Sequence, residues 1–204
     1  WKARMRTPNH PLVRSPFCCD PLFFFYFDAM HNNDCKGVSN LAMGSTLAVL
    51  LSSWRVGRTR PERLATLNAA MREWYSQRPG SHRLLKIRMS NLVDSSGWAD
   101  LNGPMIKAAN SRAAVPMIRD LSYMYLPDDN DRNQCIHKLL DNLTEYYELI
   151  YSEPMFMSEA AVARLEEVLI ELGEAWMDLR EMARERGLQL WKINSKVHKI
   201  MHTG

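Results

Sequence analysis

Residues 22–38 read LFFFYFDAMHNNDCKGV, and the rest of the chain is best interpreted outward from this stretch. Residues 22–27 are all apolar and mostly aromatic, which favours a buried strand over a helix. Asp28 and His31 follow at once, and a polar turn then ends at Gly37. A strand that ends at the edge of a sheet would deliver this carboxylate and this imidazole together. The sequence therefore predicts a functional site here.

Asp28 and His31 are the side chains in this stretch that are suited to catalysis. A carboxylate at the end of a buried strand is well placed to hold a divalent metal ion, because the strand fixes its position and the edge leaves room for substrate. In two-metal nucleases, such ions activate water and stabilise the leaving oxygen. The alternative is structural: Asp28 would cap the following turn and His31 would pack against Met30.

Length and composition are those of a folded protein. With 204 residues, 46% hydrophobic and 24% charged, the chain fits one domain with at most a small appendage. No apolar run approaches the roughly 20 residues that span a bilayer, and no secretory signal is recognisable. We therefore expect an intracellular protein without a membrane partner. Its four cysteines are then expected to be reduced thiols: Cys18, Cys19, Cys35 and Cys135.

Helical periodicity covers most of the chain beyond residue 38. The first of these segments, residues 39–54, is apolar nearly all round up to and including Trp54, which predicts a central position. A short strand is predicted at residues 188–193. The fold class that we expect is mainly α, a helical bundle with one or two short strands. Helices are predicted at about residues 39–54, 61–76, 104–126, 132–151 and 158–186.

Local signals mark where several of these helices begin and end. Thr59 or Arg60 lies where a helix cap is expected, just before a proline. Ser158 is the predicted N-cap of the longest helix, and Gly187 is its predicted C′ residue. Pro116 lies within the segment 104–126 and is expected to kink that helix or divide it into two.

Charge is distributed unevenly along the chain. Residues 1–92 contain 14 Lys and Arg against 5 Asp and Glu, whereas residues 93–204 contain 12 against 18. A basic first half is suited to a polyanionic partner, although long arginine side chains also simply solubilise helix surfaces. The best candidate for electrostatic contact with DNA is the group of arginines around the second helix start: Arg55, Arg58, Arg60 and Arg63.

A second pair of cations lies in the segment KAANSRAA at residues 107–114. Its small side chains let a helix pack closely, while Lys107 and Arg112 are long enough to reach a phosphate. The alternative is a tight helix–helix contact flanked by two solvated cations.

Two histidines near the end of the chain have the spacing of metal ligands. Asn194 or Ser195 is expected to cap a final helical turn, on which His198 and His202 are four residues apart and share a face. Lys199 stands where a zinc protease needs its general-base glutamate, so that activity is not expected. The alternative is two surface histidines.

Three segments together resemble one protein family. Residues 27–31 (FDAMH), followed by KGV at 36–38 and by Gly44 and Ser45, resemble the D-x-M-H region of eukaryotic DDE transposases of the CACTA-like and Kyakuja-Dileera-Zisupton-like groups. Residues 107–113 (KAANSRA) resemble their K-A-A-x-x-R-A helix. Residues 195–202 (SKVHKIMH) resemble their P-K-x-H-x-x-x-H segment, with serine where proline is usual.

The resemblance implies an RNase H-like core interrupted by a helical insertion. Asp28 would be the second acidic ligand of Mg²⁺ or Mn²⁺, and the segment of His198 and His202 would return towards it. The implied parts are residues 1–38 (basic arm, core strand and D-x-M-H segment), 39–187 (helical domain) and 188–204 (short strand and helical turn). The other two acidic ligands are expected before and after this sequence, so the triad is incomplete and the chain is expected to be inactive alone.

The first hypothesis is therefore that the chain is a fragment of a DDE transposase-like protein whose ancestral substrate was DNA. If the resemblance holds, the protein is expected in the nucleus, and a homo-oligomer is possible. The second is a non-catalytic helical protein-interaction module in which Asp28 and His31 are structural. A third is a helical metal-binding protein that uses His31, His198 and His202.

Overall fold

The computed structural model describes residues 37–78, 82–84, 86–103, 106, 108–152 and 157–201. This part of the chain is mainly helical, which confirms the predicted helical bundle. It contains no strand, only an isolated antiparallel bridge between Val93 and Ala99. The predicted strand at 22–27, with Asp28, His31, Lys107 and His202, lies outside the described residues. The α-helices are α3 (Val38–Leu50), α4 (Arg60–Ser76), α5 (Ala108–Tyr125), α6 (Asp131–Ser152), α7 (Glu159–Glu185) and α8 (Ser195–Met201).

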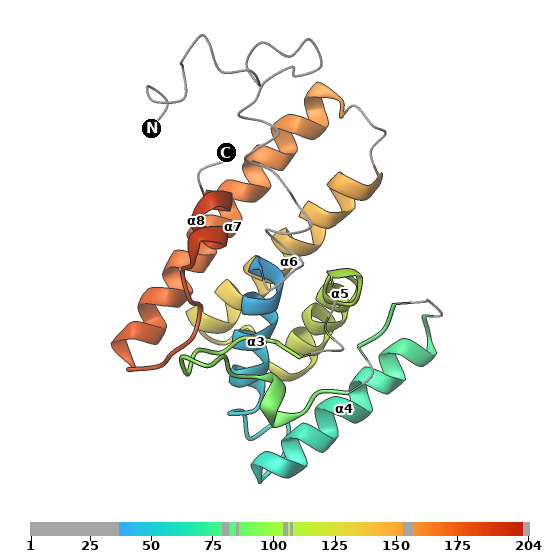
Figure 1. The fold of residues 1–204 in the computed structure, drawn as a ribbon, viewed down its shortest axis with the longest axis vertical. Helices are drawn as coiled ribbons and strands as arrows, with labels where there is room; N and C mark the ends of the chain where they lie inside the picture. The colour runs from blue at the N-terminus through green and yellow to red at the C-terminus, as the bar shows by residue number, and fades with distance from the viewer. Residues whose placement is uncertain are drawn as a thin grey trace.

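Helix α3 lies at the centre of the bundle. Each of its residues except Ala48 is buried, as expected for a helix that is apolar nearly all round. It packs against α5 and α6, and α6 packs most extensively against α7. Figure 1 shows α3 in the middle, with α7 along one side of the molecule and α4 along the other. The core is therefore built around the first helix that the structure describes.

The end of α3 differs from the prediction. The helix stops at Leu50 rather than at Trp54, and the chain turns there. The Trp54 side chain is 76% exposed instead of belonging to the core. Apolar character alone misassigned it, because a tryptophan next to an apolar run has the same pattern whether it continues the helix or leaves it.

Polar residues of α3 anchor two irregular segments, residues 93–103 and 188–194. Asn40 Nδ2 donates to the carbonyl of Leu101 over 2.7 Å. A Cβ on Gly44 would lie 2.6 Å from the backbone of Asp100, so only glycine allows this crossing. Ser45 Oγ accepts a hydrogen bond from the backbone N–H of Trp191 over 2.9 Å. In this fold, Gly44 and Ser45 thus have clear structural roles.

The predicted strand at residues 188–193 is wrong. This segment is a turn in which Trp191 is buried with φ 55, a left-handed conformation that costs energy for a bulky residue. The turn is held by packing and hydrogen bonding: the Trp176 indole donates to the Trp191 carbonyl over 3.3 Å, and the two rings meet edge to face. A short apolar run is equally consistent with a buried strand and a buried turn, which is why periodicity failed here.

Most of the predicted helix ends are confirmed. Ser158 Oγ accepts from the N–H of Ala161, and Gly187 adopts φ 65 just beyond α7. Asn194 Oδ1 caps α8 by accepting from the N–H of Val197. Helix α5 runs through Pro116 without dividing, so of the two predicted effects of this proline the split is wrong and the kink stays a prediction. The division of the chain at residues 38 and 187 stays a prediction.

Candidate nucleic-acid interface

The loop between α3 and α4 projects an aromatic ring and several cations from the bundle. Trp54 is at its tip, and the Arg55 guanidinium lies over the indole at 5.4 Å from the ring centroid. Arg58 and Arg60 follow within six residues, and both are exposed. Three of the four predicted DNA-contacting arginines are therefore exposed, and one of them, Arg55, lies against Trp54, a residue that the sequence prediction missed.

Arg63 has a different place in the structure, because its guanidinium is bonded to the loop backbone. It donates to the carbonyls of Leu51 and Gly57, each over 2.8 Å, and to that of Arg58 over 3.2 Å. The Leu51 carbonyl lies at the carboxyl end of α3, where a cation is also favoured by the helix dipole. Arg63 therefore shapes the loop from within.

The start of α4 fixes the other side of the same loop. The Glu62 carboxylate accepts from the backbone N–H groups of Arg58 and Thr59 over 3.1 and 3.0 Å, and Thr59 Oγ1 accepts from the N–H of Glu62. This capping box confirms Thr59 as the helix cap. The hydrogen bond from Thr59, with that from Arg58, lowers the pKa of Glu62. The Glu62 carboxylate is thus directed at backbone N–H groups and not at the neighbouring arginine side chains.

Arg58 and Arg60 lack a carboxylate partner within the described residues. Arg55 is paired only loosely, with 3.9 Å between its guanidinium and the carboxylate of Asp129. Arg63, in the first turn of α4, is fully used by the fold. As far as the described residues show, the guanidinium groups of Arg58 and Arg60 remain available to an external anion, and that of Arg55 is held only by the loose pair with Asp129.

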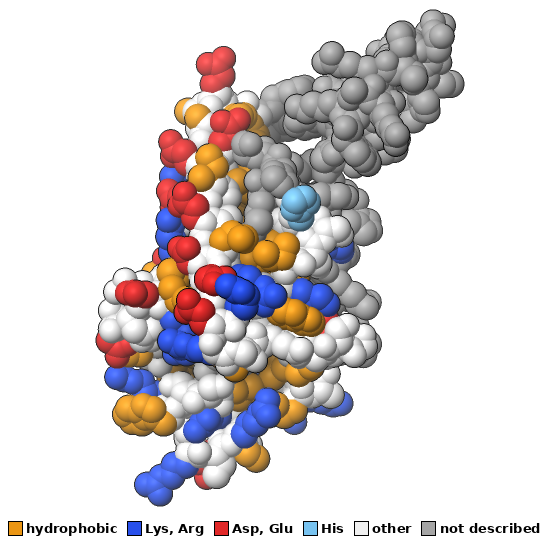
Figure 2. Space-filling model, turned by 90° about the vertical axis from the view of Figure 1, so that its left-hand side faces the viewer, with side chains coloured by type: hydrophobic (Ala, Val, Ile, Leu, Met, Phe, Trp, Pro, Cys, Tyr) orange, Lys and Arg blue, Asp and Glu red, His pale blue; other side chains and the backbone are white. Residues whose placement is uncertain are grey.

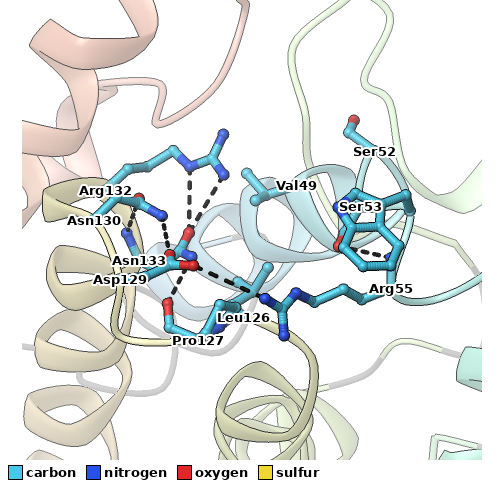
Figure 3. Close-up of a pocket in the computed structure, with 11 residues that line it drawn as sticks. Val49, Ser52, Ser53, Arg55, Leu126, Pro127, Asp129, Asn130, Arg132 and Asn133 are labelled. Carbon is cyan, nitrogen blue, oxygen red and sulfur yellow. Dashed lines mark hydrogen bonds and ion pairs between the residues drawn. The ribbon is translucent and has the colours of Figure 1, made fainter.

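A cleft of about 270 Å³ opens beside Trp54, between this loop and the start of α6. Arg55 and Arg132 lie on opposite sides of it, as Figure 3 shows, with Asp129 between them. Arg132 donates to Asn133 Oδ1 over 3.3 and 3.4 Å, and its burial, helped by nearby Arg186, lowers its pKa. The lining residues are Val49, Ser52, Ser53, Trp54, Arg55, Leu126, Pro127, Asp129, Asn130, Arg132 and Asn133.

This cleft adds Arg132 to the cations that sequence reasoning had selected. Arg132 follows an acidic loop, and no sequence pattern around it indicates a binding site. It lines the same cleft as Arg55 only because α6 packs beside α3. Guanidinium groups on two sides of a cleft of mixed polar and apolar lining suit an anionic group, which would compete with Asp129 for Arg55.

Arg112 is not brought to this site. Its guanidinium stacks on the ring of Tyr151 at 4.0 Å from the centroid, at the far end of α6. Since Arg132 and Tyr151 are 19 residues apart on one helix, the two sites are separated by about 30 Å. Any contact that Arg112 makes with a phosphate would belong to a different surface.

The predicted metal ligands are only partly within the described residues. His198 is exposed on α8, which packs against α7. Among the residues that the structure describes, no group of three or more His, Cys, Asp or Glu side chains could hold a metal ion. The roles of Asp28, His31 and His202 stay predictions.

The charge of the molecule separates in space as well as along the chain. Residues 55–88 contain nine Lys and Arg against two Asp and Glu, whereas α7 contains three against eight. In Figure 2, acidic and hydrophobic side chains gather over the upper part of the face shown, and Lys and Arg predominate at its lower end. A polyanion would therefore be drawn to one end of the molecule and repelled by the other.

Comparison with family models, with curated proteins and with solved structures gives no match to this chain. Within the described residues, no helix has the length and apolar character to cross a bilayer. Function must therefore be argued from the site itself.

Proposed function

We propose that this chain binds DNA through the loop of residues 54–60, as the helical part of a DDE transposase-like protein. The observation that carries the proposal is the exposed Trp54 ring on a short segment with three exposed arginines. Arg55 lies over the ring and is paired only at 3.9 Å with Asp129, and Arg58 and Arg60 have no carboxylate partner within the described residues. Arg63 and Glu62 hold the backbone on which these side chains stand.

Each part of the loop has a distinct task in this proposal. Guanidinium groups contact phosphate oxygens and release counterions, which supplies affinity without reading sequence. An indole offers a face on which an unpaired base stacks, and such stacking is tolerant of base identity. Because a base inside a duplex is already stacked, we expect single-stranded DNA, or a distorted DNA end, to bind more tightly than a regular duplex.

The transposase-like part of the proposal rests on residues of which only His198 lies in the described part of the chain. Asp28 would hold Mg²⁺ or Mn²⁺ with His31 nearby, and the segment of His198 and His202 would return towards it. It is supported by the resemblance of three ordered segments and by the predominantly helical fold expected of the insertion. Strand cleavage would need further acidic ligands, so this chain alone is proposed to bind DNA without cutting it.

The test is a titration of fluorescently labelled single-stranded and duplex DNA, followed by anisotropy between about 50 and 200 mM salt. With about three phosphate contacts, the logarithm of the association constant should fall with log salt with a slope of roughly −2. The single variants Arg58→Ala and Arg60→Ala should each weaken binding and flatten that slope. Arg184→Ala, which removes an exposed arginine already paired with Glu181, is the matched control. Absence of binding at the lowest salt would refute the proposal.

A protein-interaction module is the second candidate function. It is favoured by a row of exposed apolar side chains on α7, on the side of that helix that faces solvent. Both functions can belong to one chain, because the two surfaces are separate.

A further inference from the structure

Helix α7 has two apolar faces, and only one of them is covered. Its core face includes Val168, Leu172 and Trp176, all buried. Its outer side carries Val162, Ile170 and Met177, which are 42, 54 and 49% exposed. Apolar side chains scattered singly are normal at a surface, but these three lie about two turns apart along one helix.

A groove lies in the middle of this outer face. It has a volume of about 510 Å³ and is lined by Leu169, Ile170, Gly173, Glu174, Met177 and Asp178. Gly173 has no side chain and leaves the space between Ile170 and Met177 open. Two carboxylates, Glu174 and Asp178, stand at its rim. Glu174 pairs with Lys138 at 3.5 Å, but that pair is exposed and 62% of the Glu174 side chain is accessible. The groove therefore offers an apolar interior with an acidic edge.

The α3–α4 loop has the complementary features. Trp54 is the most exposed large hydrophobic side chain among the described residues, and Arg55 lies over its ring. Arg58 and Arg60 stand on the same short loop. An indole is flat and apolar enough to enter the groove, and the adjacent guanidinium groups would then face carboxylates. The projecting Trp54 side chain, called the knob below, and the α7 groove are thus complementary in shape, and the groups around them are opposite in charge.

We propose that a second copy of this chain inserts its Trp54 into the α7 groove, with Arg55 and Arg58 of that copy against Glu174 and Asp178. Because the knob and the groove are different surfaces of one molecule, the contact is heterologous and joins copies head to tail. A chain of copies has an unused Trp54 at one end and an unused groove at the other. Further copies can therefore add at both ends, and the assembly grows with protein concentration.

This contact uses the same loop as the proposed DNA site, and the two therefore exclude each other. DNA in excess should dissolve the assembly into monomers bound to DNA. The inference does not depend on the DNA proposal, since the charge and the shape of the two surfaces are sufficient for it.

The test is sedimentation velocity of the full chain at increasing concentration, in low and in high salt. We expect the weight-average mass to rise with concentration at low salt and to fall towards the monomer at high salt, because the rim contacts are screened. Trp54→Ala lacks the knob and Met177→Glu blocks the groove, so each variant alone should remain monomeric. Circular dichroism checks that both variants keep their helices.

The decisive sample is the equimolar mixture of these two variants. Trp54→Ala retains an intact groove and Met177→Glu an intact knob, so one productive contact forms and growth stops at a dimer. A wild-type chain that stays monomeric at low salt, variants that still associate, or a mixture that stays monomeric would each overturn the inference.

DNA binding by Met177→Glu separates this inference from the proposed function. The variant should lose self-association and keep wild-type DNA affinity. If the wild-type chain self-associates but binds no DNA, only the proposed DNA-binding function is refuted. If it binds DNA but stays monomeric at every concentration, only the inference of self-association is refuted.

Discussion

The arginines of α7 and those of the α3–α4 loop are the same residue type in opposite circumstances. On α7, Arg164 donates to both oxygens of Glu145 over 2.6 and 2.8 Å and also contacts Glu167. These hydrogen bonds, with that from Glu145 the strongest influence, raise the pKa of Arg164. In the loop, Arg58 and Arg60 have no such partner within the described residues.

The number of cations on a surface therefore does not locate a binding site for an anion. What locates it is whether the cations are already paired with carboxylates of the same protein. Arg164 and Arg184 of α7 are neutralised by glutamates one turn away or on α6, so these two present no net positive charge. Glu62, the carboxylate next to the loop arginines in sequence, is turned towards backbone N–H groups, and Asp129 is only loosely paired with Arg55 at 3.9 Å. Surface ion pairs contribute little stability, so the α7 pairs chiefly orient side chains.

The largest effect is expected from Arg63, the arginine in the first turn of α4 that holds the preceding loop. Arg63→Ala removes three hydrogen bonds to backbone carbonyls, and we expect the free energy of unfolding to fall by about 2 kcal/mol. Urea unfolding followed by circular dichroism measures it. Arg72→Ala, an exposed arginine on the same helix, is the control and should change stability little. Equal losses in both variants would show that Arg63 does not hold the loop.

Trp54 should have the next largest effect, and on binding rather than on stability. Trp54→Ala removes a base-stacking surface, and we expect single-stranded DNA to bind about tenfold more weakly, which corresponds to about 1.4 kcal/mol. Trp54→Phe keeps an aromatic face and should recover part of the affinity. Anisotropy titration at fixed salt makes the measurement. An unchanged affinity in Trp54→Ala would mean that the arginines act without stacking.

Sequence patterns were sufficient for the helices of this fold. Pro61, with Thr59 or Arg60 just before it, marked the start of α4, and Gly187 marked the end of α7. Such signals are local: they depend on backbone groups within one turn of the residue that marks them. The same patterns failed for Trp54 and for residues 188–193, where burial was decided by distant packing against α3.

The candidate site was predictable only in part, for the same physical reason. The basic loop was recognisable from composition, since Arg55, Arg58, Arg60 and Arg63 lie within nine residues. The different role of Arg63 depends on carbonyls that no sequence pattern displays. The approach of Arg132 to Arg55 joins residues 77 positions apart, and nothing in the sequence around either one indicates it.

A smaller effect on stability is expected from the partly buried ion pair of Lys192 and Asp94. It is intermediate between the exposed ion pairs of α7 and the loop arginines that lack a close carboxylate. Lys192 donates to Asp94 over 2.7 Å and ties residues 188–194 to the turn after Val93. Burial is the strongest influence on the pKa of Asp94 and raises it, but the hydrogen bonds from Lys192, Trp98 and Ser96 together lower it below its ordinary value of 3.8. The stabilisation is therefore present above that value and is lost as pH falls through the folded-state pKa.

Asp94→Asn tests this pair at constant side-chain size. We expect the variant to be about 1 kcal/mol less stable than wild type at neutral pH, and the difference to vanish in acid as Asp94 becomes protonated in the wild type. Urea unfolding at a series of pH values measures both. A difference that persists unchanged in acid would assign the loss to packing instead of charge.

The smallest effect is expected from Arg184, which is exposed and donates to Glu181 one turn away. Arg184→Ala should leave the thermal midpoint unchanged, because an exposed pair of this kind contributes almost nothing after side-chain ordering and screening. It should also leave DNA affinity unchanged, although it removes the same formal charge as either single substitution at Arg58 or Arg60. If it weakened DNA binding as much as those substitutions, affinity would follow net charge alone, and the unpaired loop arginines would lose their special status.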